Sequence, residues 1–281
     1  MTPTVKPLDG KVAFISGIAR GQGRAHALRL AADGARIVGF DLCGQIETVP
    51  FAMSTPDDLA ETVRLVEDAG GAIVAEVADV REQGEVDAVF KRGLAEFGRV
   101  DIVVANAGIG HDYVHTHLID DVAFRNVMDV NVVGVWHTVK AAVPVMIEQR
   151  DGGSVVMTGS GAAVMGIPNL GGYVATKHAV IGLMRTMAKE LGRHSIRVNA
   201  VLPGNCNTPM FDNDGIKRLY VPNAESVTPE AFRARAAAMA PMRIPWVEAS
   251  DVAEAVAWLV SPAARFVSGA LVPVDGGGAV P

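Results

Sequence analysis

The sequence predicts an α/β fold: a doubly wound parallel sheet with helices on both faces. Short apolar runs that end in glycine or a polar residue alternate with segments of helical periodicity along the chain. Such alternation implies right-handed crossovers between parallel strands. The 281 residues, 49% apolar and 20% charged, suffice for one large core, so we expect a single domain over residues 1–281.

The elements follow one another in the order that such a sheet requires. The expected strands are residues 11–16, 36–40, 72–80, 100–105, 154–157, 196–202 and 269–274. The expected helices are residues 25–35, 60–69, 86–97, 122–146, 172–193 and 251–259. The second helix should begin near Asp57, because Ser54 or Thr55, then Pro56 and acidic residues, are typical of a helix start.

Composition excludes several classes of function. The net charge is −6 and no segment gathers lysine and arginine into a stripe, so we expect no binding to nucleic acid or to a membrane surface. The first residues carry no apolar core of signal-peptide length, and no run reaches the roughly 18 apolar residues of a membrane span. Cys43 and Cys206 match no disulfide or metal framework. A cytoplasmic protein is therefore expected.

A glycine-rich turn joins the first strand to the first helix. Gly17, Gly21 and Gly23 form the pattern G-x-x-x-G-x-G. Between a strand and a helix, such glycines permit a tight turn and let a pyrophosphate approach backbone N–H groups at the positive end of the helix. The alternative is a purely structural turn.

An acidic residue, Asp41, follows the second strand directly. A carboxylate there can accept hydrogen bonds from an adenosine ribose and would repel a 2′-phosphate, which favours NAD over NADP. Arg20, inside the glycine turn, is a residue type that could attract that phosphate. The alternative role for Asp41 is that of a turn residue.

A hydroxyl, a phenol and an ammonium occur close together at Ser160, Tyr173 and Lys177. Tyr173 and Lys177 are four residues apart, so on a helix they share one face. A phenol with an ordinary pKa of about 10 becomes a base near neutral pH only if that pKa falls by roughly two to three units, and a neighbouring cation favours this change. A lone Y-x-x-x-K is otherwise more often a surface helix pair.

These motifs together resemble the short-chain dehydrogenase/reductase family, over nearly the whole chain. The family has a glycine turn that matches Ser16 to Gly23, a serine about a dozen residues before Y-x-x-x-K, and a D-G-G ending that matches residues 275–277. The resemblance implies a Rossmann fold and the NAD-dependent interconversion of an alcohol and a ketone. It implies that Tyr173 removes the hydroxyl proton, that Ser160 holds the substrate oxygen, and that Lys177 lowers the pKa of the tyrosine and binds the nicotinamide ribose.

Further site residues are implied by the same resemblance. Asn131, inside an apolar helix, matches the asparagine that holds a proton-relaying water, Asp79 and Val80 match residues that meet the adenine, and Thr208 lies near the carboxamide. The implied cofactor-binding set is Gly17, Arg20, Gly21, Gln22, Gly23, Asp41, Leu42, Asp79, Val80, Asn106, Ala107, Gly108, Tyr173, Lys177, Pro203, Gly204 and Thr208.

Two long segments depart from a minimal chain of this family. An insertion at about residues 42–56, with D-L-C before it and P-D-D-L-A-E-T-V after it, resembles the mycofactocin-coupled, carveol-dehydrogenase-like subgroup. That resemblance implies NAD held without exchange, an external redox cofactor as electron acceptor, and, for the family, a homotetramer. We expect Val49, Phe51 and Met53 to cover the cofactor; a neutral surface loop is the alternative. Residues 205–246 are long and apolar, which predicts a lid over a hydrophobic substrate.

Two other functions remain as alternatives. A 3-oxoacyl thioester reductase would use the same residues, although Asp41 disfavours the NADPH that such enzymes often use. A nicotinamide-binding sensor would keep the fold without catalysis. A metal site at His111, His115 and His117 lacks partner carboxylates or cysteines, so we predict no metal and a loop on the substrate side.

Overall fold

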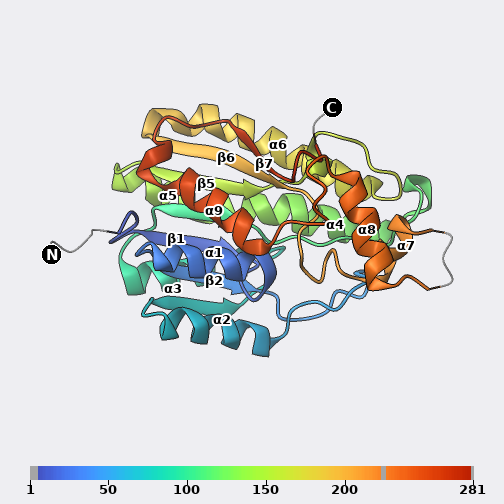
Figure 1. Cartoon of the computed structure of the whole chain (residues 1–281). Helices are drawn as coiled ribbons and strands as arrows, with labels where there is room; N and C mark the ends of the chain where they lie inside the picture. The colour runs from blue at the N-terminus through green and yellow to red at the C-terminus, as the bar shows by residue number, and fades with distance from the viewer. Residues whose placement is uncertain (1–5, 223–225, 280–281) are drawn as a thin grey trace.

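Seven parallel strands form one sheet in the computed structural model, which describes residues 6–222 and 226–279 (Figure 1). The strands are β1 (Val12–Ser16), β2 (Arg36–Asp41), β3 (Ile73–Val77), β4 (Ile102–Ala105), β5 (Gly153–Thr158), β6 (Ile196–Pro203) and β7 (Leu271–Val274). Their order is β3-β2-β1-β4-β5-β6-β7, and every neighbouring pair is parallel. The order reverses between β1 and β4, so the predicted doubly wound parallel sheet is confirmed.

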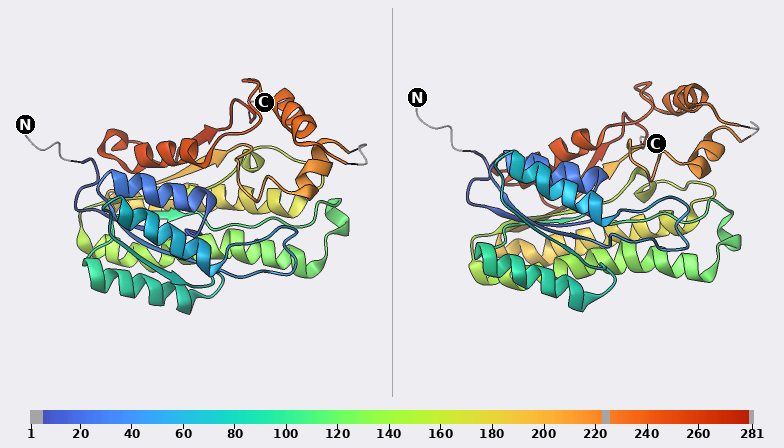
Figure 2. Two further views of the ribbon diagram at one scale, coloured as in Figure 1. Left: turned by 60° about the horizontal axis from the view of Figure 1, so that its bottom comes forward. Right: turned by 90° about the horizontal axis from the view of Figure 1, so that it is seen from below.

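Helices cover both faces of this sheet. They are α1 (Gly21–Ala32), α2 (Pro56–Asp68), α3 (Gln83–Phe97), α4 (Asp121–Met128), α5 (Gly134–Gln149), α6 (Gly171–Leu191), α7 (Asp214–Tyr220), α8 (Pro229–Met239) and α9 (Ala249–Val260). The two views of Figure 2 show α1, α2 and α9 on one face and α3, α5 and α6 on the other. The core therefore consists of two apolar layers, one on each side of the sheet.

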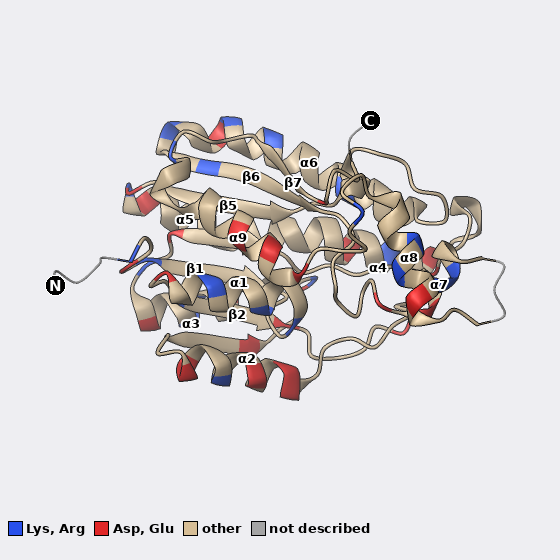
Figure 3. Cartoon of the chain, viewed as in Figure 1, with Lys and Arg blue, Asp and Glu red and all other residues tan. Residues whose placement is uncertain are grey.

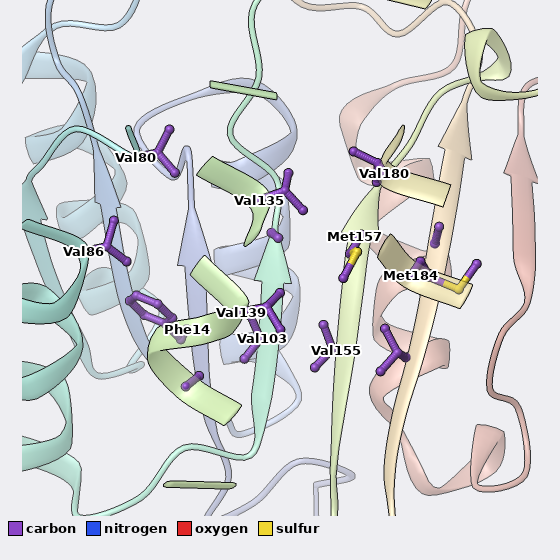
Figure 4. Packing of buried hydrophobic residues seen from close by; sticks show 14 of the residues in the cluster. Phe14, Val80, Val86, Val103, Val135, Val139, Val155, Met157, Val180 and Met184 are labelled. Carbon is purple, nitrogen blue, oxygen red and sulfur yellow. The ribbon is translucent and has the colours of Figure 1, made fainter. Parts of the chain in front are cut away.

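The layer under α5 and α6 is packed with branched and sulfur-containing side chains. In Figure 4, Phe14, Val103 and Val155 project from the strands toward Val139 of α5 and Met184 of α6. All five side chains are fully buried. Burying each such side chain contributes about 1.5–3 kcal/mol to folding, so this layer stabilises the sheet.

One predicted strand was wrong in extent, and one predicted helix contains an irregular segment. The helix expected over residues 122–146 is α4 and α5 joined by a π-helical segment, Asp129–Val133, which contains the fully buried Asn131. Short π-helical segments are frequent at functional sites. The strand expected over residues 72–80 is shorter, Ile73–Val77, because the backbone N–H of Asp79 donates to Glu85 and its carboxylate binds Arg81. The remaining elements occur where expected, with bounds that differ by a few residues.

The continuous helical stretch Asp121–Gln149 is 29 residues long and apolar enough to cross a membrane, although the sequence predicted no such segment. Half of its apolar window is buried inside the fold, where α5 contacts α3 and β4. Length and composition of this kind are also those of a core helix. In Figure 3, basic and acidic residues are interspersed over the helices of the described chain.

Two segments lie beyond the carboxyl ends of the strands, at the right of Figure 1. Residues 42–56, here called the strap, connect β2 to α2, and Thr55 caps α2 with a capping box that includes Asp58. Residues 205–246, here called the lid, carry α7 and α8 between β6 and α9. The part of the lid at residues 223–225 lies outside the described residues.

Candidate active site

A cavity of about 730 Å³ opens at the carboxyl ends of the strands, between the strap and the lid. Ligands bind at this edge in open α/β sheets, where the strand order reverses. Nearly every residue of the predicted site lines the cavity, and the two exceptions are Gly23 and Asn131. The fold therefore brings together residues that are more than 180 positions apart in the sequence, from Gly17 to Thr208.

The glycine turn is shaped by close backbone approaches. Gly17 and Gly21 have φ of +72° and +55°, and a Cβ at Gly17 would lie 2.8 Å from Cα of Ala107. A Cβ at Gly23 would lie 1.8 Å from the carbonyl oxygen of Gly17, which explains why Gly23 lies beneath the turn instead of facing the cavity. Helix α1 begins at Gly21, and its N-cap residue, Arg20, makes no side-chain capping bond. The first N–H groups of α1 are thus oriented to receive an anion.

Asp41 lies at the end of β2, and its carboxylate accepts hydrogen bonds from other residues. The backbone N–H of Ala19 donates to Oδ2 at 2.9 Å, and the hydroxyl of Ser54 donates to Oδ1 at 2.5 Å. Each oxygen of a carboxylate can accept more than one hydrogen bond. The two oxygens of Asp41 can therefore also accept hydrogen bonds from a ribose. The sequence offered no reason to single out Ser54 for this contact, because the strap has no strand or helix pattern.

Two further bonds attach the strap to the body of the protein. The guanidinium of Arg20 donates to the carbonyl oxygen of Ala52, and the amide of Asn126 donates to the hydroxyl of Thr48 at 3.0 Å. Arg20 is thus directed toward the strap, although its residue type suggested a role in attracting a 2′-phosphate. The strap is therefore bonded both to the glycine turn and to α4.

The apolar side chains of the strap are divided between the cavity and the core. Phe51 and Met53 line the cavity, and Phe51 approaches Gly110 on the opposite side. Their covering of the cofactor stays a prediction. Val49 is buried in the core cluster and does not line the cavity, so its predicted place over the cofactor was wrong, and Ile46 lines the cavity in addition. A residue that follows no regular element cannot be assigned to the core or the cavity by periodicity.

Asn106, after β4, joins three strand ends. Its backbone N–H donates to the hydroxyl of Ser16 at 3.1 Å, and its amide donates to the carbonyl oxygens of Ser16 and Gly17 at 3.2 Å each. The hydroxyl of Thr158 donates to its Oδ1 at 3.3 Å. These bonds fix the floor of the cavity between β1, β4 and β5.

On the far side of β2, Asp79 and Val80 line the cavity where the resemblance places an adenine. The carboxylate of Asp79 forms a salt bridge of 2.6 Å with Arg81, which also donates to Asn126. The contact with Arg81 lowers the pKa of Asp79, against the effect of burial, which is the largest single contribution and raises it. Glu82, not Asp79, is the residue before α3, so Asp79 does not cap that helix.

The loop after β6 closes the cavity from the other side. Gly204 approaches Asp275 so closely that a Cβ there would lie 2.8 Å from the Asp275 side chain. Thr208 reaches the glycine turn, with its methyl group 3.3 Å from the position of a Cβ on Gly21. Pro203, Gly204 and Thr208 all line the cavity.

Ser160, Tyr173 and Lys177 converge at the centre of the cavity wall. Ser160 follows β5 and accepts a hydrogen bond from the N–H of Ala162 at 3.2 Å. Tyr173 and Lys177 share one face of α6, and Nζ of Lys177 lies 5.5 Å from the centre of the Tyr173 ring. The ammonium donates to the carbonyl oxygen of Thr158 at 2.8 Å. The spacing argument from the sequence is thus confirmed for these two side chains.

The pKa of Tyr173 does not shift in the direction that the sequence predicted. Burial raises the pKa of the Tyr173 phenol, and the Ser160 hydroxyl opposes that shift. Burial also lowers the pKa of Lys177 to about 8. Within the polypeptide alone, Lys177 therefore does not lower the pKa of Tyr173, and the predicted shift requires a further positive charge beside the phenol.

Asn131 lies behind the cavity wall and binds two segments of the chain. Its Oδ1 accepts from the N–H of Ile109 at 2.8 Å, and its Nδ2 donates to the carbonyl oxygen of Ile109 at 2.9 Å. Nδ2 also lies 3.2 Å from the hydroxyl of Thr176, which donates to the carbonyl oxygen of Tyr173 at 2.7 Å. The amide is satisfied by protein groups, and its predicted role in holding a water stays a prediction.

The lid contributes aromatic rings, of which Phe211, Tyr220 and Trp246 line the cavity. Its rings pack edge-to-face or tilted against one another, with centroids 5.3–6.3 Å apart, at Phe211, Tyr220, Phe232 and Trp246. The hydroxyl of Tyr220 donates to Asn205 at 2.7 Å, and Tyr113 is hydrogen-bonded to Asn213 across the cavity. In residues 6–222 and 226–279, no group of three histidine, cysteine or acidic side chains is arranged to hold a metal ion.

Comparisons with known proteins agree with this geometry. A sequence model of a family described as enoyl-(acyl carrier protein) reductase matches residues 17–278. The (−)-trans-carveol dehydrogenase of Rhodococcus erythropolis is 42% identical over 270 residues, which are 96% of this chain and 98% of that protein. The crystal structure of carveol dehydrogenase from Mycobacterium avium in complex with NAD is 47% identical with a TM-score of 0.96, and it covers 98% of this chain and 100% of that one.

The chain belongs to the short-chain dehydrogenase/reductase family. A short chain dehydrogenase from Mycobacterium paratuberculosis bound to NAD is also similar, with a TM-score of 0.89, 44% identity, and coverage of 97% of this chain and 99% of that one. The protein is an NAD-dependent oxidoreductase. The predicted family and cofactor are therefore confirmed.

The residues present fit NAD. Gln22, in the glycine turn, lines the cavity with a buried Oε1 that has no hydrogen-bond partner among the described residues. A buried, unsatisfied oxygen is costly, so it indicates a donor that a ligand supplies. The close approaches at Gly17 and Gly23, the open N–H groups of α1 and the carboxylate of Asp41 form the rest of a dinucleotide cradle.

Proposed function

We propose that this member of the short-chain dehydrogenase/reductase family oxidises a hydrophobic secondary alcohol to its ketone with NAD, and that the alcohol is terpenoid in size and shape, like carveol. The observation that carries the proposal is the composition of the cavity walls. Apolar strap residues and aromatic lid residues line the same cavity as Ser160, Tyr173 and Lys177. The similarity to two carveol dehydrogenases supports a cyclic terpenoid substrate.

The acid–base step follows from the positions of the side chains. Ser160 binds the substrate oxygen, and the ionised Tyr173 takes the hydroxyl proton. NAD, when bound, would accept a hydride. The carbinol carbon then loses a hydride as its oxygen loses a proton, and the product is a ketone. Lys177, held by the carbonyl of Thr158, binds the nicotinamide ribose and adds its charge beside the phenol. Asn131 orders a water that passes the proton onward from Lys177.

The strap is proposed to cover the adenosine half of the cofactor and to make its release slow. Three contacts support this role: the bond of Ser54 to Asp41, the bond of Arg20 to Ala52, and the approach of Phe51 to Gly110. NAD can leave only after these contacts open. Repeated turnover then needs an external acceptor, such as a mycofactocin-like redox cofactor, that reoxidises NADH in place.

The remaining parts of the proposal concern the whole protein. We propose one NAD-binding domain over residues 1–281, with the strap as an insertion and residues 205–246 as a substrate lid, working in the cytoplasm as a homotetramer. Exposed aromatic residues support association between copies: Trp258 and Phe266 near one edge of the sheet, and Phe124 and Trp136 on α4 and α5. Light scattering of the purified protein tests the tetramer.

The experiment that tests the function uses purified protein and a panel of cyclic terpenoid alcohols. With a dye as electron acceptor, we expect ketone formation for carveol-like alcohols and little for short linear ones. With added NAD and no dye, we expect little more than one ketone per site. Failure to oxidise any alcohol under both conditions would contradict the proposed function.

The same assay separates the two alternatives. A 3-oxoacyl thioester reductase would reduce a 3-oxoacyl thioester faster than any terpenoid ketone. A non-catalytic sensor would bind NAD and turn over none of these substrates. The apolar, ring-lined cavity supports the terpenoid alcohol over both.

A further inference from the structure

The amino end of α6, which carries Tyr173, is not capped by the side chain of its own N-cap residue. Leu170 is the N-cap residue, and it makes no side-chain hydrogen bond. The first N–H groups of a helix need partners from outside it, and an uncapped end frays. Tyr173 is the third residue of α6, so it lies within this first turn.

His111 supplies the missing cap from the loop after β4. The backbone N–H of Tyr173 donates to Nε2 of His111 at 3.1 Å, while Nδ1 lies 2.6 Å from the carbonyl oxygen of Asp112. One neutral tautomer satisfies both contacts, with Nδ1 as donor and Nε2 as acceptor. The side chain is 1% exposed, so the imidazole is built into the fold and is not a surface residue.

The helix sequence accommodates this contact. A Cβ at Gly172 would lie 3.0 Å from both Cδ2 and Nε2 of His111, so a larger residue there would displace the imidazole. Gly171 is similarly close to Thr116, whose hydroxyl would lie 2.1 Å from a Cβ. The paired glycines at the start of α6 let the loop that carries His111 and Thr116 lie against the helix end.

The contact closes a circuit of hydrogen bonds around the reactive tyrosine. Asn131 holds Ile109 through its backbone N–H and carbonyl, and it reaches Thr176 on α6. Thr176 in turn donates to the carbonyl oxygen of Tyr173. His111, two residues beyond Ile109, completes the circuit at the N–H of Tyr173.

We propose that His111 is a positioning residue, which fixes the backbone of Tyr173, and so the phenol, by accepting the hydrogen bond of its N–H group. This inference rests on the proposed role of Tyr173 as the acid–base group. It assigns to His111 a task other than metal binding or substrate contact. Positioning matters because a displacement of about 1 Å in a reacting group can reduce the rate about a hundredfold.

The test compares His111→Ala, His111→Gln and the matched control His178→Ala. Gln places a carbonyl oxygen near the position of Nε2, whereas Ala removes the acceptor. His178 is an exposed histidine on the same helix, so its removal changes no contact with Tyr173. We expect His111→Ala to lower kcat about ten- to a hundredfold with KM changed less than threefold, His111→Gln to restore kcat to within about threefold, and the control to match the wild type.

An activity-independent measurement separates this inference from the proposed function. Hydrogen exchange of the Tyr173 amide should be slow in the wild type, at least tenfold faster in His111→Ala, and slow again in His111→Gln. Gly172→Ala, which improves helix propensity, should nevertheless speed exchange and lower kcat by displacing the imidazole. Unchanged exchange and kcat in His111→Ala, or a Gln variant as impaired as the Ala variant, would overturn the inference, whatever the substrate proves to be.

Discussion

The hydroxyl of Ser54 donates a 2.5 Å hydrogen bond to the carboxylate of Asp41, so the strap is attached to the acidic residue predicted to bind the adenosine ribose. A second oxygen of that carboxylate is held by the N–H of Ala19. The proposed determinants of cofactor choice and of cofactor retention therefore share one carboxylate, that of Asp41. Variants at the two positions can separate these effects.

Asp41→Ala should weaken NAD binding and relax discrimination against NADP. Loss of a hydrogen bond to a charged group costs about 1–3 kcal/mol, which corresponds to an affinity loss of about five- to 150-fold. Ser54→Ala keeps the carboxylate, so it should leave the NAD-to-NADP preference unchanged and speed only NAD release. Titration with both nucleotides checks the first result and stopped-flow displacement the second. Equal preference in wild type and Asp41→Ala would place Asp41 outside the ribose site.

Tyr173→Phe should abolish turnover while NAD affinity stays within a few-fold of the wild type, because only the proton-transferring oxygen is removed. The rate of ketone formation measures turnover, and titration with NAD measures the affinity. A variant that keeps more than a tenth of the wild-type rate would rule out the phenol as the acid–base group. Tyr220→Phe removes the hydroxyl of another tyrosine that lines the cavity, so it tests whether the loss of any phenolic hydroxyl there has the same effect.

Shortening residues 45–53 to a tight turn should convert the protein to ordinary NAD exchange with steady-state kinetics on added NAD. The intact protein should carry nicotinamide through gel filtration and exchange labelled NAD slowly. Phe51→Ala alone removes one apolar contact and should speed dissociation about tenfold or more. Glu47→Ala, at an exposed strap position, should have no such effect. A wild-type protein that elutes empty and turns over freely with NAD would disprove the covering role.

His26, on α1 beneath the glycine turn, should make stability depend on pH. Burial lowers the pKa of this fully buried side chain to about 4. Between pH 6.5 and pH 4 the unfolded chain binds the proton and the folded chain does not, so stability falls as the pH falls through this window. The loss from this group between pH 7.5 and pH 5 is about 2 kcal/mol.

His26→Leu should remove this part of the pH dependence and, because both ring nitrogens lack partners among the described residues, should not lower stability at pH 7.5 by more than about 1 kcal/mol. Urea unfolding at several pH values measures the free energy of unfolding of both proteins. The contributions of the carboxylates cancel in the difference between them. His178→Gln, at an exposed site, controls for loss of a histidine. Parallel stability curves for His26→Leu and the wild type would show that His26 is not the titrating group.

The amino-acid sequence by itself determined the strand–helix alternation, the glycine turn, Asp41 and the pairing of Tyr173 with Lys177. These features depend on local spacing: apolar runs, glycines that tolerate positive φ, and the helical repeat that stacks residues four apart. The family and NAD followed from the same motifs. Even the start of α2 at Pro56 was visible in the residues that cap it.

Only the tertiary structure decided what irregular or distant residues do. The contacts of Ser54 with Asp41 and of His111 with Tyr173 join segments that no period relates, 13 and 62 positions apart. The burial of Val49 and the turn of Arg20 toward Ala52 likewise depend on how the strap packs. Burial raises the pKa of Tyr173, and the spacing of Tyr173 and Lys177 along the helix gives no information on burial. The lowering of that pKa expected from the sequence is therefore absent in the polypeptide alone.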